Sequence, residues 1–98
     1  MYVELSKSNN KNKKFKAVIN GDKTIHFGHS QYQDYTTHND DQRKKNYIAR
    51  HSNEDHSKKN VASPAFLSRH ILWNKPTIQA SINDLNKKYA DIKFTMKR

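Results

Sequence analysis

The sequence predicts an α+β fold, in which a small N-terminal antiparallel sheet of about three strands packs against two or three short helices. Strand-like runs of β-branched and aromatic residues occur within the first 27 residues, whereas helix start signals and apolar residues at helical spacing appear only from residue 40 onward. A chain of 98 residues is typical of one domain, because a core of this size rarely divides. We therefore expect a single small basic domain over residues 1–98.

The predicted strands are 2–5, 15–19 and 24–27. Asn20-Gly21 lies between the second and third strands, and this pair is a strong hairpin signal because both central residues of a type I′ turn need positive φ. Side chains alternate across a strand, so one face of the hairpin is apolar. The residues expected on that face are Phe15, Ala17, Ile19, Ile25 and Phe27. Gly28 is expected to end the sheet.

Three helices are predicted in the second half. Asp40 and Asp41 cap the first, over 42–51, because acidic side chains favour the positive end of a helix. Ser63-Pro64 starts the second, with serine as the cap and proline at the first helical position, and Lys75-Pro76 stops it. Pro76 is expected to open the third. Its apolar stripe, at i, i+4, i+7 and i+11, is Ile78, Ile82, Leu85 and Tyr89.

The remaining segments carry weaker signals. Residues 29–39 show neither a helical nor a strand period and are predicted to form a structured loop. The polar stretches 6–14 and 52–63 are expected to be loops or arms, because they lack the apolar area that offsets the entropy of ordering. Ile92 and Phe94 form a last short strand or lie across the core. The predicted core is Phe15, Ile19, Ile25, Phe27, Ile48, Phe66, Leu67, Ile71, Trp73, Ile78, Ile82 and Leu85.

The charge of the chain indicates its partner. Nineteen Lys and Arg against nine Asp and Glu give a formal net charge of +10, and the excess is spread along the sequence. We expect a nucleic acid as the partner, DNA before RNA, bound without sequence specificity, because phosphate contacts need many cations and no fixed spacing. The predicted contact surface is Lys13, Lys14, Lys16, Arg43, Lys44, Lys45, Arg50, Arg69 and Lys75.

Arg43 and Arg50 are the sharpest candidates, because a guanidinium engages phosphate with two hydrogen bonds and both lie on one helical stripe beside Tyr47. The structural alternative is that they pair with nearby carboxylates at 34, 40 or 41. The tyrosines at 32, 35 and 47 either stack on unpaired bases or pack in the core. Trp73 is expected in the core.

Other chemistries have little support in the sequence. No cysteine is present, which excludes disulfides and thiolate ligands. Six histidines raise the question of a metal site, at His26 with His29 or at His51 with His56, but no compact four-ligand spacing occurs. His38, near Asp40, resembles a metal-dependent nuclease only distantly; we expect His38, Asp34 and Asp40 to tie down the loop and cap the first helix. We predict no enzymatic activity, no cofactor and no metal.

No apolar run is long enough for a signal peptide or a membrane span, so we expect a soluble protein with no membrane partner, inside a cell. The second-ranked function is a protein-interaction or virion structural module that docks on an acidic protein. A metal-dependent nuclease is a distant third. The sequence leaves the oligomeric state open.

Four stretches together resemble one family. They are His26-Phe27-Gly28, then Tyr32-x-Asp34-Tyr35-Thr36-x-His38-x-Asp40-x-x-Arg43-Lys44-x-x-Tyr47-x-Ala49-Arg50-His51, then Phe66-x-Ser68-Arg69-x-Ile71-Leu72-Trp73-Asn74-Lys75-Pro76-Thr77, and Ser81-Ile82-x-Asp84. This pattern resembles a family of small basic uncharacterised proteins encoded by giant (nucleocytoplasmic large) DNA viruses of algae and amoebae and by some phages. The likeness covers residues 15–90 and departs from the pattern at Gln31, where glycine is expected, and at His70, where tryptophan is expected.

The resemblance implies a viral origin and assigns no catalytic residue, because the family carries no established activity. For a large DNA virus, a small basic protein suggests genome packaging or condensation, either in the virion or in the infected host cell.

Overall fold

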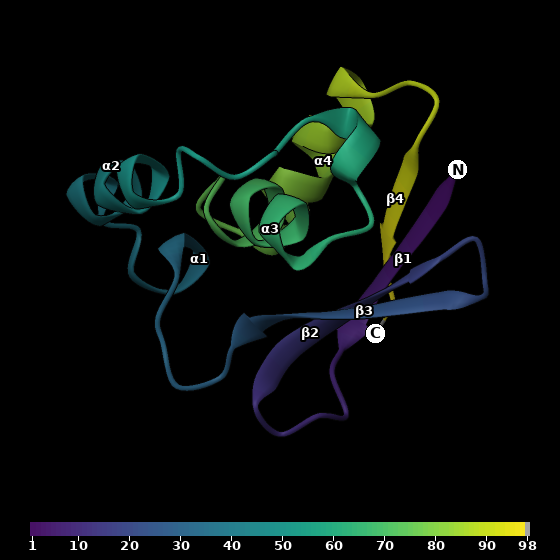
Figure 1. The fold of residues 1–98 in the computed structure, drawn as a ribbon, viewed down its shortest axis with the longest axis horizontal. Helices are drawn as coiled ribbons and strands as arrows, with labels where there is room; N and C mark the ends of the chain where they lie inside the picture. Colours follow the sequence, from purple (N-terminus) through teal and green to yellow (C-terminus); the bar gives the residue numbers. More distant parts are fainter. Residues whose placement is uncertain (98) are drawn as a thin grey trace.

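A computed structural model describes residues 1–97 and contains one four-stranded sheet. The strands are β1 (Tyr2–Lys7), β2 (Lys13–Ile19), β3 (Lys23–His29) and β4 (Lys93–Met96), in the order β3-β2-β1-β4 (Figure 1). β1 pairs antiparallel with β2 and β2 pairs antiparallel with β3, whereas β4 runs parallel to β1. The predicted α+β class is confirmed, but the sheet is mixed because the C-terminal strand returns beside the N-terminal one.

The β2–β3 hairpin forms as predicted. Asn20 and Gly21 have φ values of 53° and 79°, the positive angles that a two-residue turn of this type requires. Phe15 lies opposite Phe27 and Ala17 opposite Ile25, so the apolar residues do share one face. The strands are longer than predicted: β1 and β2 take up both ends of the polar stretch 6–14, and β3 continues one residue past Gly28.

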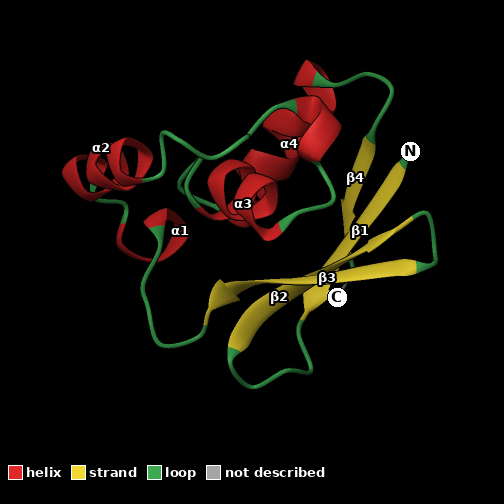
Figure 2. Cartoon of the chain, in the orientation of Figure 1, coloured by secondary structure: helices red, strands yellow, loops and turns green. Residues whose placement is uncertain are grey.

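The helices lie on one side of the sheet (Figure 2). They are α1 (Tyr35–His38), α2 (Asp41–Arg50), α3 (Pro64–Leu67) and α4 (Ile78–Lys88), with a 3₁₀ turn η1 (Lys58–Asn60) and a π-helical segment η2 (Ser68–Leu72). Asp40 caps α2 and Ser63 caps α3, both as predicted, and their side-chain oxygens accept from the backbone N–H groups of the first turn.

Two expectations about the helices were wrong. Pro76 does not open the third helix; Thr77 is its cap, with Oγ1 accepting from Ala80 N at 3.0 Å, and α4 begins at Ile78. The segment 29–39 is not all loop, because a single helical turn forms at α1. Asp34 caps that turn, and Asn39 in the left-handed conformation ends it.

β4 is held to α4 by one side chain. Asn86 Oδ1 accepts from Phe94 N at 2.8 Å, and Asn86 Nδ2 donates to Phe94 O at 3.0 Å. Ile92 and Phe94 are 4% and 1% exposed, so the C-terminal segment both pairs with β1 and contributes to the core. Of the two alternatives for this segment, the strand is the one that forms.

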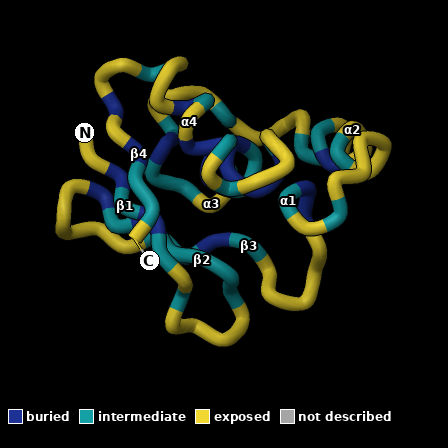
Figure 3. The backbone as a smooth tube through the Cα atoms, turned by 180° about the vertical axis from the view of Figure 1, so that it is seen from behind, coloured by how far each residue is buried: buried dark blue, intermediate teal, exposed yellow. Residues whose placement is uncertain are grey.

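The core lies between the sheet and the helices (Figure 3). Eight of the twelve predicted core residues are buried, and Phe15, Ile25, Ile48 and Ile78 pack against them partly buried. The predicted core omits nine of the buried hydrophobic side chains, which are Val3, Leu5, Ala17, Tyr35, Tyr47, Val61, Leu72, Ile92 and Phe94. None of the helices in residues 1–97 is both long enough and apolar enough to cross a membrane.

Candidate nucleic-acid interface

A cleft of about 890 Å³ opens between the hairpin β2–β3, the following loop, helix α2 and the segment α3–η2. Four cationic side chains line it, together with three aromatic residues and several amides. The cations are Lys13, Lys14, Arg43 and Arg50; the aromatic residues are Tyr32, Tyr47 and Trp73; the amides are Gln31, Gln33 and Asn46. Asp34 is the one carboxylate among the described lining residues. The cleft is therefore cationic and polar, with an aromatic wall.

Helix α2 presents one face to the cleft. Arg43, Tyr47 and Arg50 recur at i, i+4 and i+7, which places them on one side of a helix, and Asn46 lies on the same side. The two guanidinium groups belong to residues seven positions apart, about 10 Å along the helix axis. The predicted stripe thus lies on a concave surface.

The two arginines are free of carboxylates. Within residues 1–97, neither Arg43 nor Arg50 forms an ion pair, and both are exposed. Arg43 instead donates from Nη1 to Gln33 Oε1 at 3.2 Å. The three nearby carboxylates have other partners. Asp34 caps α1 and pairs with Lys14, and Asp40 caps α2. Asp41 accepts from the Tyr35 hydroxyl at 2.6 Å. The ion-pair alternative for these arginines is therefore not what forms.

Lys14 differs from the other three cations. Its Nζ lies 2.6 Å from Asp34 Oδ2, and the Asp34 side chain is only 4% exposed. Thr36 also donates to Asp34, from its backbone N and its hydroxyl. Because Asp34 already neutralises Lys14, the cations with uncompensated charge in the cleft are Lys13, Arg43 and Arg50.

The aromatic residues divide into a buried pair and an exposed ring. Tyr47 and Trp73 stack at 4.3 Å between centroids and 2° between planes, and burial raises the pKa of Tyr47 to about 12. Tyr35 is also buried, so Tyr35 and Tyr47 follow the core-packing alternative, and Trp73 is in the core as predicted. Tyr32 is 69% exposed and lies against His29 at 4.6 Å.

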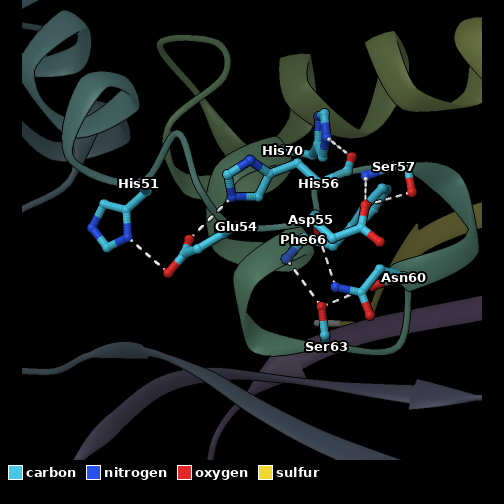
Figure 4. A network of polar contacts seen from close by, with 9 residues as sticks. All are labelled: His51, Glu54, Asp55, His56, Ser57, Asn60, Ser63, Phe66 and His70. Carbon is cyan, nitrogen blue, oxygen red and sulfur yellow. Dashed lines mark hydrogen bonds and ion pairs between the residues drawn. The ribbon is translucent and has the colours of Figure 1, made fainter.

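His51 lies at the edge of the cleft and is held by a carboxylate (Figure 4). Its Nδ1 is 2.9 Å from Glu54 Oε2, and the ring stacks on Tyr47 at 4.3 Å. His56 Nε2 lies 3.1 Å from the other Glu54 oxygen. The hydrogen bond from His51 lowers the pKa of Glu54, and the bond from His56 adds to this, so the carboxylate remains ionised.

The connection between α2 and α3 is organised by similar side-chain bonds. Asp55 Oδ1 accepts from both the N–H and the hydroxyl of Ser57, and Asn60 Nδ2 donates to the Asp55 carbonyl (Figure 4). Ser63 Oγ donates to the Asn60 carbonyl and accepts from Phe66 N. This polar segment, 52–63, therefore joins the helical layer through hydrogen bonds, with Val61 as its buried apolar anchor.

The other predicted cations do not line the cleft. Lys44 Nζ donates to Asn74 O at 2.5 Å and lies over the Tyr35 ring. Burial is the main cause that lowers the pKa of Lys44, and the positive charges of Arg69 and Lys75 lower it further. Arg69 donates to Trp73 O at 3.3 Å. Lys44 and Arg69 thus bind the carbonyls of the two residues that precede Lys75, and the three cations form a second basic cluster, Lys44, Arg69 and Lys75. Lys16, opposite His26, alternates with the core residues of β2 and belongs to the outer face of the sheet. Lys45 lies on α2 and is exposed outside the cleft.

His38 and Asp40 have the structural role expected for them. His38 Nδ1 accepts from Asp40 N at 2.9 Å, and Asp40 in turn caps α2. His26 bonds to Ser8 Oγ at 2.7 Å. Among residues 1–97, no group of three or more His, Asp or Glu side chains has an arrangement that could hold a metal ion.

Sequence reasoning missed the amides of the cleft. Asn46 carries a usable signal, because it lies three residues after Arg43 and four before Arg50, on the same helical face. Gln31 and Gln33 carry none, since they lie in a loop without periodicity and reach the cleft only through the tertiary fold.

Comparison with known proteins adds a family and no activity. No curated protein and no solved structure matches the chain. One family, described as a family of unknown function (DUF5754), matches residues 3–51, which are 49 of the 98 residues. The match spans β1 to α2 and includes Lys13, Arg43 and Arg50 of the cleft. The chain therefore belongs to this family of unknown function.

Proposed function

We propose that this protein binds nucleic acid without sequence specificity, through phosphate contacts made in the basic cleft, with DNA as the main partner. One observation carries the proposal: Arg43 and Arg50 line one concave surface beside Lys13 and have no carboxylate partner within residues 1–97. A guanidinium without a carboxylate partner retains its full charge, and Arg43, which gives only one Nη1 hydrogen bond to Gln33, has further donors for a phosphate.

The composition supports the same proposal. A net charge of +10 on 98 residues attracts a polyanion and releases its counterions on contact. Asp34, Asp40 and Asp41 act as helix caps or pair with Lys14 and Tyr35, and Glu54 bonds to His51 and His56, so none of them forms an ion pair with the arginines. The resemblance to proteins of giant DNA viruses extends the proposal to genome packaging or condensation, in the virion or in the infected cell.

A charge-reversal pair tests where binding occurs. We expect R43E/R50E to weaken binding of a labelled oligonucleotide by at least about tenfold, because two attractive contacts become repulsive. The control is K45E/K87E, which also lowers the net charge from +10 to +6, since each change removes two units, and alters exposed lysines outside the cleft. Lys87 and Arg50 both lie in the last turn of a helix, so reversing the charge of either one has a similar unfavourable interaction with the helix dipole.

Fluorescence anisotropy is the readout, after circular dichroism has shown that both variants fold. An acidic protein of similar size serves as a competitor to distinguish nucleic acid from an acidic protein partner. Equal weakening by the two variants would show that net charge alone governs binding and that the cleft is not the contact surface.

A further inference from the structure

We propose that the cleft selects unpaired strands: the phosphates lie along Arg43 and Arg50, and one base stacks on the exposed ring of Tyr32. This inference rests on the proposed function and names its substrate class, a single-stranded nucleic acid. Its chemistry is a backbone contact combined with an aromatic platform for a base.

The size of the cleft is the first argument. Pockets of about 300–1,000 Å³ hold one drug-sized molecule, and the cleft has a volume of about 890 Å³. That space takes about one or two nucleotides, so the cleft does not enclose a double helix. Because the cations lie inside a concave surface, an extended strand reaches them more fully than the convex surface of a duplex does.

The exposure of Tyr32 is the second argument. It is the most exposed of the large apolar side chains in the described chain, at 69%, whereas the other two aromatic residues of the cleft are buried. A tyrosine ring left in water at the edge of a cationic cleft has a free face for stacking. Base–aromatic stacking needs an unpaired base and no particular sequence.

The rigidity of the Tyr32 turn is the third argument. Tyr32 N donates to His29 O at 3.2 Å, and Gln31 N donates to His29 Nδ1 at 3.2 Å. The His29 ring lies 4.6 Å from the Tyr32 ring and covers part of it. Ser30 N donates to Asn12 O at 3.1 Å, which ties the turn to the β1–β2 connection. The ring is therefore presented by a turn that is already ordered, which lowers the entropic cost of binding.

The phosphate and base contacts are also linked to each other. Gln33 directly follows Tyr32 in the loop, and its Oε1 accepts from Arg43 Nη1 at 3.2 Å. This bond fixes the loop to helix α2. Arg43 and the loop that carries Tyr32 are therefore held together at the same cleft.

The test compares four probes of equal length: single-stranded DNA, single-stranded RNA, duplex DNA, and a DNA strand with abasic sites, which keeps every phosphate and removes bases. We expect both single strands to bind the wild-type protein more tightly than the duplex or the abasic strand. Y32A should weaken single-strand binding by roughly 5- to 150-fold and leave abasic and duplex binding unchanged, and Y32F should bind like the wild type. The control is Y2A, because Tyr2 is also exposed, at 43%, and lies outside the cleft.

The outcomes separate this inference from the proposed function. Duplex binding as tight as single-strand binding, or an equal loss by Y32A on normal and abasic strands, would overturn the strand preference and leave the proposed function intact. Failure of every probe to bind at micromolar concentration would overturn the proposed function itself. The ratio of the DNA and RNA affinities then shows which strand is preferred.

Discussion

Single residues in this protein have roles that depend on what neutralises or buries them. Arg43 and Lys14 line the same cleft, yet only Lys14 has a carboxylate within reach, and Asp34 holds it at 2.6 Å. The sequence predicts the positions of both cations correctly on one surface. It does not predict which of them is neutralised, because the partner lies twenty residues away and is brought near only by the fold.

At the same scale, His70 connects stability to pH. It is 9% exposed in η2, its Nε2 lies 2.9 Å from the His56 carbonyl oxygen, and burial lowers its pKa more than this hydrogen bond raises it. The unfolded chain protonates an ordinary histidine near pH 6.5. Below that pH the unfolded chain takes up a proton that the folded protein resists, so the stability contributed above pH 6.5 is lost as the pH falls toward the lowered pKa.

We therefore expect H70Q, which keeps an amide donor near the Nε2 position and does not titrate, to lose less stability than the wild type between pH 7 and pH 5. Denaturant unfolding across this range measures the difference. The pairs that His51 and His56 form with Glu54 are common to both proteins, so they cancel. Parallel stability curves would show that His70 does not carry this pH dependence.

At the scale of elements, the sequence predicts the features that depend on contacts between residues close together in the chain. The Asn20-Gly21 turn, the Asp40 cap and the Ser63-Pro64 start all form as predicted. Local signals do not decide the fourth strand, because its pairing with β1 joins the two ends of the chain and no local pattern encodes that. The α1 turn was missed because four residues are too few for a helical period.

Gly28 lies where β3 and η2 come close together. A Cβ at this residue would lie 2.7 Å from Leu72 Cδ1. The backbone φ of Gly28 is +78°, an angle that residues other than glycine rarely adopt. Gly21 has φ of +79° but nothing within 4 Å of the same position. Both changes to alanine incur the strain of positive φ, and only the first also disturbs packing.

We expect G21A to lower the free energy of unfolding by about 1 kcal/mol and G28A by about 2–4 kcal/mol. Urea denaturation of both variants gives the comparison. If the two values were equal, the close approach of Leu72 would not matter to stability, and the layer of helices would be held to the sheet by other contacts.

For the molecule as a whole, the distribution of charge is uneven in a way that composition cannot reveal. The excess of +10 is spread along the sequence, but folding gathers Lys13, Arg43 and Arg50 in the cleft and Lys44, Arg69 and Lys75 in a separate cluster. Four of the predicted surface residues line the cleft, and Lys16 belongs to the other face of the sheet. Charge count predicts a partner class, whereas the location of a binding surface requires the tertiary fold.

The most direct test of the central claim, that the cleft cations contact phosphates, is the dependence of affinity on salt. Each phosphate contact with a single strand contributes about −0.7 to the slope of log affinity against log salt concentration. The three uncompensated cations predict a slope of about −2 or steeper for the wild type, and R43Q/R50Q should reduce its magnitude by about 1.4. K45Q/K87Q should leave the slope unchanged. A slope near zero for the wild type, or the same change in both variants, would contradict the account.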